Sequence, residues 1–299
     1  MPELPEVETA RRYIERGLVG KRVVHVNVRL TKLLRDSPIP SLDPLVGQTV
    51  IGARRRAKVL VVDFTGDLSL LVHLKLAGQV AVFLPDGSRL VAGHPVPAPA
   101  GEYPHKTTHI DLRFDDGTIA WFSDVRQFGW FRLMPSGDVE AALDSFGFGP
   151  EGTEPLETEL LGEVMSRRGI PVKTLLLDQS FVAGLGNIYV DEVLFRSGVH
   201  PSIPAKSLTQ EQREKIITNI PPVLAEGIRQ GGAKIIHNVA YPVDNFPAVH
   251  GRADQPCFVC GTTIEKTRVG ARGTYFCPSC QPIDADQSPT ANGLIPAGA

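Results

Sequence analysis

The chain has 299 residues, of which 42% are hydrophobic, and its formal net charge is −2. This length suggests about two domains and allows a sizeable core. No apolar run reaches the roughly 18 residues that a membrane span needs. The acidic start of the chain excludes a signal peptide. The overall charge does not mark a nucleic-acid binder, although dense basic runs such as Arg54–Lys58 leave that class open.

The N-terminus carries an unusual candidate nucleophile at Pro2. Removal of Met1 would leave Pro2 with a free secondary amine, which can attack a carbonyl-like carbon and form an iminium. Glu3 places a carboxyl group close enough to move protons at the same carbon. The alternative interpretation is an ordinary frayed terminus. Pro2 alone does not decide between the two.

A helix is expected directly after Pro2 and Glu3. Pro5 suits its first position, and Leu4, which precedes a proline, should be non-helical. Apolar residues recur at helical spacing from Val7 to Leu18, and glycines at 17 and 20 mark the end. The helix would hold a catalytic terminus in a fixed geometry.

From Arg22 to about Leu133 the pattern is typical of strands separated by Gly- and Asp-containing turns, which predicts an antiparallel β-sandwich. The clearest strands are 59–64, 68–74, 79–84, 109–114, 118–122 and 130–133. Residues 91–104, rich in Pro, Ala and Gly, are expected to form an irregular excursion between two strands.

Helical signals dominate from about residue 135 to Gly232. Short helices are expected at 171–178 and 187–196, with Asn187 as an N-cap, and a longer helix opens with a capping box at Thr209–Gln212. Pro221-Pro222 should kink or break that helix, and Gly231-Gly232 should end it. Residues 233–252 are expected to be a loop and 282–299 a disordered tail.

All four cysteines lie close together, as Cys257-x-x-Cys260 and Cys277-x-x-Cys280. Two such tight turns on a β-hairpin supply the four thiolates that a structural Zn²⁺ needs. Two disulfides are the alternative, but no other feature points to an oxidising compartment. We therefore expect one structural zinc ion.

Five segments match one family in the same order: PELPEVETARR from Pro2; Arg55–Lys58; Asp124-x-Arg126-x-Phe128-Gly129; Val182–Tyr189; and the four cysteines. Together they resemble the formamidopyrimidine-DNA glycosylases, bacterial enzymes that excise oxidised purines from DNA. The resemblance spans residues 2–281. It implies an α+β multidomain fold: an N-terminal antiparallel β-sandwich with a leading helix, a helix–two-turn–helix domain and a C-terminal zinc-finger β-hairpin.

The resemblance implies a mechanism on a nucleotide flipped out of the duplex. The Pro2 amine would attack C1′, Glu3 would handle protons, and β- and δ-elimination would then cleave the abasic strand. Lys58 matches the family's β-elimination acid and Arg272 a residue linked to δ-elimination, while Glu6 fits a supporting acid. Without the family, Lys58 would be read as a solvent-facing lysine, Glu6 as a first-turn carboxylate and the hairpin of Arg272 as a structural element.

The resemblance also implies DNA contacts. Arg126, Phe128 and Leu76 would fill the space left by the flipped base. Four further residues would contact the DNA: Thr107, His109, Lys173 and Asn187. Asn187 can be a plain N-cap as well as a phosphate contact.

Several positions depart from the family pattern. Leu76 replaces a methionine, Lys75 a glycine and Thr107 a histidine, while Val125 and Gln127 replace proline and arginine. His250 replaces a tyrosine, and residues 234–249 are little like the usual lesion-binding segment. The catalytic residues are therefore retained while lesion choice stays open.

The sequence predicts a base-excision repair DNA glycosylase with AP lyase activity. Its substrate would be double-stranded DNA with oxidised bases or abasic sites. The protein is expected to be a monomer in the bacterial cytoplasm, associated with the nucleoid, and to have no membrane partner. Expected domains are 1–134, 135–245, 246–281 and a tail, 282–299. The lesion would be 8-oxoguanine or a formamidopyrimidine, with oxidised pyrimidines as a shifted preference. Rival readings are a non-catalytic binder of damaged or abasic DNA and a zinc-hairpin interaction protein without DNA function.

Overall fold

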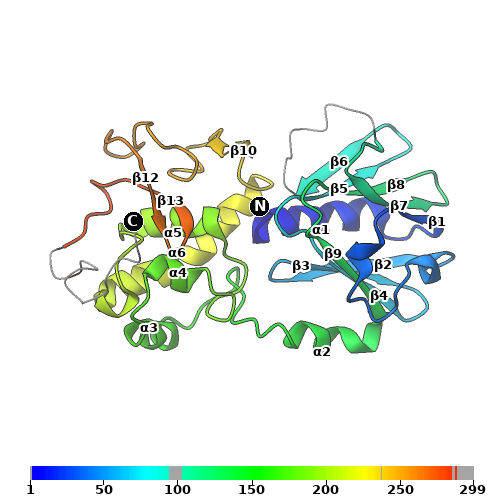
Figure 1. Cartoon of the computed structure of the whole chain (residues 1–299), viewed down its shortest axis with the longest axis horizontal. Coiled ribbons are helices and arrows are strands. Elements are labelled where there is room, and N and C mark those ends of the chain that lie inside the picture. The colour runs from blue at the N-terminus through cyan, green and yellow to red at the C-terminus, as the bar shows by residue number, and fades with distance from the viewer. Residues whose placement is uncertain (1, 94–102, 237, 285–286, 288–299) are drawn as a thin grey trace. The chain divides into compact units, whose positions relative to one another are not determined.

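The computed structural model describes residues 2–93, 103–236, 238–284 and 287 (Figure 1). Its contacts divide the chain into two compact units, residues 1–147 and 148–299. Each unit has its own core and is described by itself. Residues 94–102 of the expected excursion at 91–104 and most of the expected tail lie outside the described residues. The expectation is wrong for residues 91–93, which form the end of strand β6 (Arg89–Gly93) because their backbone pairs with residues 79–81 of the neighbouring strand.

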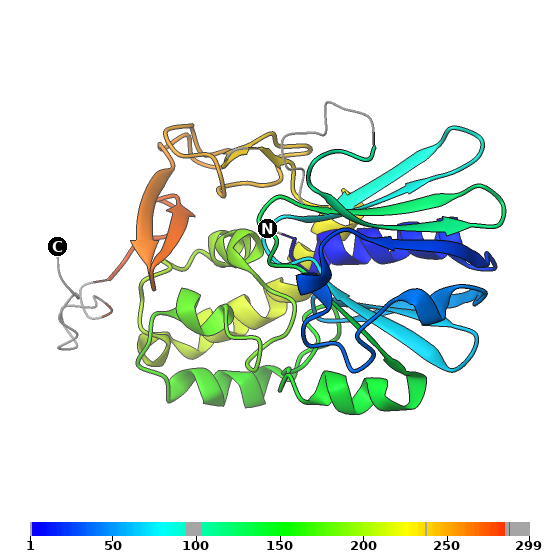
Figure 2. The same cartoon turned by 45° about the vertical axis from the view of Figure 1, so that its right-hand side comes forward.

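Unit 1 is an antiparallel β-sandwich, as predicted (Figures 1 and 2). One sheet has the order β2-β3-β4-β9, and the other has the order β1-β7-β8-β5-β6. The strands are β1 (Val23–Val28), β2 (Val50–Arg56), β3 (Val59–Phe64), β4 (Leu68–His73), β5 (Gly78–Phe83), β6 (Arg89–Gly93), β7 (Thr108–Phe114), β8 (Ile119–Asp124) and β9 (Trp130–Pro135). Their inward-facing aliphatic and aromatic side chains form one core between the sheets.

Helix α1 (Leu4–Leu18) packs against β2 and β6, which are edge strands of the two sheets. Its buried face is the apolar series that helical spacing predicted, and Val7, Ile14 and Leu18 join the core of the sandwich. Leu4 is itself helical, so the helix begins one residue earlier than predicted. The Glu6 carboxylate accepts the Glu3 amide, and this cap stabilises a helix that begins at Leu4, with Pro5 as its second residue.

Two connections cross from one sheet to the other at the same end of the sandwich. Residues 74–77 join β4 to β5, and residues 125–129 join β8 to β9. The residues that flank the two connections pair with each other across the strands: His73 pairs with Trp130, and Gly78 pairs with Asp124. The two connections therefore lie side by side. Helix α2 (Val139–Asp144) and the short 3₁₀ turns η1 (Thr31–Leu34), η2 (Asp43–Leu45) and η3 (Ser136–Asp138) complete unit 1.

Unit 2 is helical at its centre, with α3 (Thr158–Ser166), α4 (Val172–Leu176), η4 (Ala205–Ser207), α5 (Asn187–Ser197) and α6 (Gln210–Arg229). The capping box at Thr209 and Gln212 opens α6 as predicted. The expected break at Pro221-Pro222 is wrong, since α6 continues through both prolines. The buried face that includes Ile217 and Ile220 packs against α3 and α5, and this tertiary packing outweighs the missing amides.

Strands at the end of unit 2 form two small hairpins. The expected loop at 233–252 contains β10 (Ile235–Ile236) and β11 (Val239–Ala240), which pair with each other. The second hairpin joins β12 (Glu265–Val269) to β13 (Arg272–Phe276) through Gly270 and Ala271, both with positive φ, as a two-residue turn requires. Of the expected tail, Gln287 is buried and donates to the carbonyl of Ser207, so this residue is ordered.

Candidate active site and DNA-binding residues

The first residues of the chain are held firmly at the start of α1. Pro2 is buried, and Glu3 is fully buried. The Glu3 amide donates to Glu6 Oε2 at 2.8 Å, and the reciprocal bond to the Glu3 side chain completes a capping box. This contact is a helix cap, which is the structural alternative that the sequence left open for Glu6, and its supporting role in catalysis stays a prediction. The backbone next to the candidate nucleophile thus has a fixed geometry.

Glu8 links α1 to strand β2, a connection that sequence reasoning missed. Its carboxylate accepts hydrogen bonds from Arg11 and Arg12 on its own helix and from Arg55 Nε at 3.0 Å. Burial tends to raise the pKa of Glu8, but the hydrogen bonds from Arg11 and Arg12 and the charge of Arg55 lower it overall. Glu8 therefore stays ionised and ties the helix that carries Pro2 and Glu3 to the strand that leads to Lys58. Its spacing from the two helical arginines is the signal that the sequence offered.

Lys58 lies in the β2–β3 turn and is half-buried, next to Ala57, whose φ is 52°. The charge of Lys58 acts on His73, at the end of β4. Burial first, and then the charges of Lys75 and Lys58, lower the pKa of His73 to about 3, so this imidazole is neutral. Its Nδ1 accepts the backbone amide of Lys75 at 2.9 Å. The structure thus gathers Lys58, His73 and Lys75 at one end of the sandwich.

The three candidate void-filling residues lie on the two crossing connections: Leu76 on residues 74–77, and Arg126 and Phe128 on residues 125–129. The side chain of Phe128 is 52% exposed, and the Arg126 guanidinium lies 5.3 Å from the centre of its ring. Leu76 is partly buried. An exposed aromatic ring beside a cation, on a connection next to an apolar side chain, has the composition of a wedge that enters stacked bases.

Asp124 fixes the shape of residues 125–129, a role that sequence reasoning did not assign. Its buried carboxylate accepts the amides of Arg126 at 2.9 Å, Phe128 at 2.9 Å and Gly129 at 2.8 Å. A side chain at Gly129 would collide with Phe122 and approach the Asp124 carboxylate. The motif Asp-x-Arg-x-Phe-Gly therefore has a physical basis, in which the aspartate and the glycine shape the connection that presents the arginine and the phenylalanine.

The candidate DNA contacts at the start of β7 and just before it are less accessible. His109 is 6% exposed, and its Nε2 lies 2.9 Å from the carbonyl oxygen of Asp124, which places it behind the 125–129 connection. Thr107 is partly buried, and its hydroxyl lies 2.9 Å from His105 Nδ1. In this structure both residues support neighbouring backbone and side chains.

In unit 2, Lys173 is fully buried rather than displayed on the surface. Its Nζ donates to Asp191 Oδ1 at 2.7 Å and to the carbonyl oxygen of Gly273 at 3.1 Å. Asp191 also accepts from the amide of Tyr275, and its Oδ2 lies 2.7 Å from His250 Nδ1. Sequence reasoning missed Asp191, although its position with Glu192 in an otherwise apolar helix was a signal. This buried group joins α4 and α5 to the zinc hairpin.

Asn187 is the first residue of α5, and Gly186 is the N-cap, so the predicted N-cap role of Asn187 is wrong. The amide Nδ2 of Asn187 donates to the carbonyl oxygen of Gly273 at 2.9 Å, and the side chain is therefore turned toward the hairpin and away from its own helix. Arg272, one residue before Gly273, is exposed on the first position of β13. The helices thus hold the backbone beside an exposed arginine.

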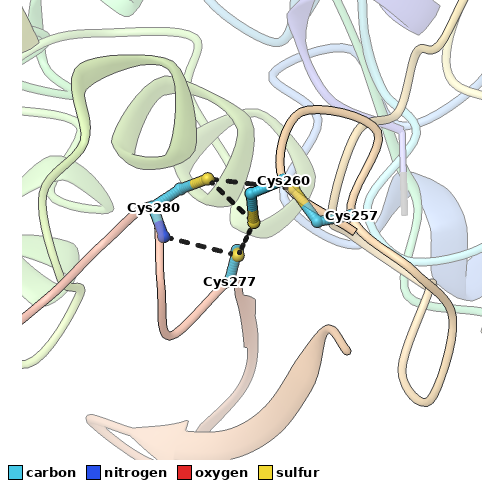
Figure 3. A group of neighbouring side chains, drawn as sticks. All are labelled: Cys257, Cys260, Cys277 and Cys280. Atoms are coloured by element: carbon cyan, nitrogen blue, oxygen red, sulfur yellow. Dashed lines mark hydrogen bonds between the residues drawn. The ribbon is translucent and has the colours of Figure 1, made fainter. Parts of the chain in front are cut away.

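The four cysteines converge on one point in unit 2 (Figure 3). The Sγ atom of Cys260 lies 3.4 Å from the Sγ atom of Cys277 and 3.5 Å from that of Cys280. The Sγ atom of Cys257 lies 3.9 Å from that of Cys280. A tetrahedral zinc ion with Zn–S bonds of about 2.3 Å needs S···S separations of about 3.8 Å, so the site fits Zn²⁺. Burial, followed by hydrogen bonds to neighbouring thiols, raises the pKa of Cys280, and a bound cation removes the repulsion between thiolates.

Three family models match the chain in succession. The formamidopyrimidine-DNA glycosylase N-terminal domain matches residues 1–131, the formamidopyrimidine-DNA glycosylase H2TH domain matches residues 148–238, and the zinc finger found in FPG and IleRS matches residues 254–283. The chain belongs to the formamidopyrimidine-DNA glycosylase family. It is a base-excision repair DNA glycosylase with AP lyase activity, and its Cys₄ cluster is a zinc finger.

Full-length relatives support this assignment. The formamidopyrimidine-DNA glycosylase of Streptococcus thermophilus strain CNRZ 1066 is 37% identical over 94% of this chain and 99% of its own length, and that of Bacillus cereus strain ZK / E33L is 36% identical over 94% and 99%. A solved complex of the Lactococcus lactis enzyme with DNA containing an abasic site has a TM-score of 0.82 and 31% identity, covering 94% of this chain and 100% of that one. Among the described residues, no helix is long and apolar enough to cross a membrane.

Proposed function

We propose that Pro2 is the nucleophile with which this glycosylase removes damaged bases and that Glu3 moves the protons of the reaction. The observation that carries this proposal is the capping box, because it fixes the backbone at Pro2 and Glu3 without occupying the Pro2 nitrogen. After removal of Met1, the Pro2 amine attacks C1′ of a flipped nucleotide. The bond between C1′ and the base breaks, and the base leaves with the bonding electrons and takes up a proton.

The later steps follow from the iminium that joins C1′ to Pro2. Glu3 protonates the ring oxygen as the sugar opens, and the iminium acidifies the C2′ proton. Loss of that proton expels the 3′ phosphate by β-elimination, and a second proton loss expels the 5′ phosphate by δ-elimination. Lys58 is proposed as the acid for the β-elimination and Arg272 as the cation that assists the δ-elimination. Glu8 and Arg55 are proposed to hold α1 and β2 in the arrangement that these steps need.

The lesion is proposed to be 8-oxoguanine or a formamidopyrimidine. Solved relatives of 32% identity are complexes with DNA containing Fapy-dG in one case and carbocyclic 8-oxo-G in another. In this chain the segment that departs most from the family pattern exposes apolar side chains at Ile236, Val239 and Tyr241. An apolar surface at this place selects the base by shape more than by hydrogen bonds, and a shift toward oxidised pyrimidines is the alternative.

We further propose that the enzyme acts as a monomer in the bacterial cytoplasm and associates with the nucleoid. Its relatives are bacterial. The proposed division of labour is a catalytic domain at 1–134, a helix–two-turn–helix domain at 135–245 and a zinc finger at 246–281.

Borohydride trapping tests the catalytic proposal. Incubated with an abasic or 8-oxoguanine duplex and reductant, the wild-type enzyme should form a covalent adduct of protein and DNA. Pro2→Gly, or protein that retains Met1, should form none. Pro5→Ala changes a proline of the same helix start without removing the amine, and it should still be trapped.

The outcomes separate the candidate functions. A protein that binds an abasic duplex tightly but gives no adduct on any damaged duplex is a non-catalytic binder, and the Pro2 proposal is then wrong. Adduct formation that survives Pro2→Gly would mean that another amine is the nucleophile. A panel of duplexes carrying 8-oxoguanine, formamidopyrimidines or oxidised pyrimidines would give the lesion preference from the relative single-turnover rates of excision.

A further inference from the structure

Lys75 occupies a backbone conformation that suits glycine. Its φ is 50°, in the left-handed region that side chains with a Cβ atom adopt at a cost. The conformation is imposed locally, because the Lys75 amide donates to His73 Nδ1 and the Gly78 amide donates to the carbonyl oxygen of Leu74. A lysine therefore stands where a glycine would satisfy the same turn with less strain.

The side chain of Lys75 adds no ion pair among the described residues that would offset this strain, and it is exposed. The charges that act on nearby His73 are those of Lys75 and Lys58, and both are positive. The left-handed backbone therefore opposes this residue in the isolated protein.

Lys75 lies next to the residues of the candidate wedge. It immediately precedes Leu76 on one crossing connection, and Arg126 and Phe128 lie on the connection beside it. A cation next to a wedge can reach the phosphates that flank a distorted base step, and their negative charge compensates its positive charge.

We propose that Lys75 is a phosphate-contacting residue that holds the DNA backbone beside the wedge formed by Leu76, Arg126 and Phe128. This inference rests on the proposed function, because it requires that the wedge enters DNA. In this proposal Lys75 lowers the stability of the free protein and raises its affinity for DNA. Structures under strain at binding sites commonly show this exchange of stability for function.

The test measures stability and DNA affinity in the same variants of the full-length zinc protein. Lys75→Gly removes both the strain and the charge. It should lower the equilibrium constant of unfolding about threefold, because relief of strain is partly offset by glycine entropy in the unfolded chain. It should also weaken binding to an abasic duplex and reduce the slope of log K against log salt by about 0.9.

Two matched variants separate the effects. Lys75→Gln keeps the left-handed side chain and loses the charge, so it should show the same change in salt slope without the gain in stability. Asp67 also has a positive φ, of 55°, but it precedes β4 at the opposite end of that strand. Asp67→Gly should stabilise the protein and leave DNA affinity and salt slope unchanged.

The results distinguish failure of this inference from failure of the proposed function. A wild-type protein that neither binds nor is trapped on an abasic duplex would overturn both. A wild-type protein that binds and is trapped, with a salt slope equal to that of Lys75→Gln, would overturn the phosphate contact alone. Destabilisation by Lys75→Gly would show that the side chain supports the fold, and the exchange argued above would then be wrong.

Discussion

Replacing Asp191 with asparagine is expected to destabilise unit 2 by about 3–5 kcal/mol, the usual cost of removing one partner from a buried ion pair. Both Lys173 and Asp191 have fully buried side chains, and Nζ lies 2.7 Å from Oδ1. The variant leaves a buried ammonium group without its carboxylate. Lys173→Met should cost less, about 1–3 kcal/mol, because Asp191 keeps its contacts with His250 and the Tyr275 amide.

The double variant Lys173→Met/Asp191→Asn removes both charges and should be little worse than Lys173→Met alone. The coupling energy of the cycle is then close to the cost of Asp191→Asn alone, about 3–5 kcal/mol. Urea denaturation of the zinc-loaded protein, followed by a signal from unit 2, measures all four free energies of unfolding. A matched pair is available in Lys215 and Glu211, an exposed salt bridge whose cycle should give about 0.5 kcal/mol or less.

The same variants decide what Lys173 does. If it anchors the hairpin, Lys173→Met weakens DNA binding through displacement of Arg272, and the salt slope changes little. If it contacts a phosphate, as the family resemblance implies, the slope falls by about 0.9. A coupling energy near zero, together with a full loss of one phosphate contact in the salt slope, would refute the structural reasoning.

Three other predictions concern the wedge, the metal and pH. Asp124→Asn should destabilise unit 1 by about 2–4 kcal/mol, since a carboxylate that accepts three amides becomes partly a donor; an excision rate and unfolding free energy equal to wild type would contradict this. Chelation of zinc should abolish DNA binding yet leave the β-sheet circular dichroism of unit 1, whose core is separate from the cysteine cluster; binding that persists without zinc would argue against a role for Arg272. His73 takes up a proton near pH 6.5 in the unfolded protein but only near pH 3 in the folded protein, so the unfolded state binds more protons between these values. Acidification from pH 7.5 to 5.5 should therefore lower the free energy of unfolding by about 1 kcal/mol. His73→Gln should remove that part of the pH dependence in unit 1, and an unchanged dependence would show that other groups cause it.

The sequence predicted the central strands of the sandwich more readily than the edge strands. The six strands assigned individually from alternating apolar residues are β3, β4, β5, β7, β8 and β9. These are the five central strands and one edge strand, β9, and the three without individual assignments, β1, β2 and β6, are the other edge strands. Their exposed sides carry polar residues such as Arg54 and Arg89, which interrupt the apolar pattern. A pattern that depends on burial is weakest where burial is one-sided.

The site shows a similar limit. Residues defined by their own chemistry, such as the four zinc ligands, could be assigned from spacing, because the metal dictates both residue type and interval. Glu8, Asp124 and Asp191 could not, because their partners are set by tertiary packing. Arg55 is 47 positions from Glu8, and the hairpin residues that Asp191 holds are more than 80 positions away. Family resemblance placed Lys173 on the DNA, and only its surroundings revealed a buried cation.

The crossing connections impose a constraint on how this enzyme can change. Each is bounded by residues that are paired across strands, so a change of length must be absorbed within four or five residues or shift a strand by one position, and such a shift turns apolar side chains from the core to water. Diversification of the proposed DNA-contacting residues at 74–77 and 125–129 is therefore least disruptive when side chains are exchanged at constant length. Libraries that seek new lesion preferences should randomise these positions without indels and should place length variation in the segment at 234–249.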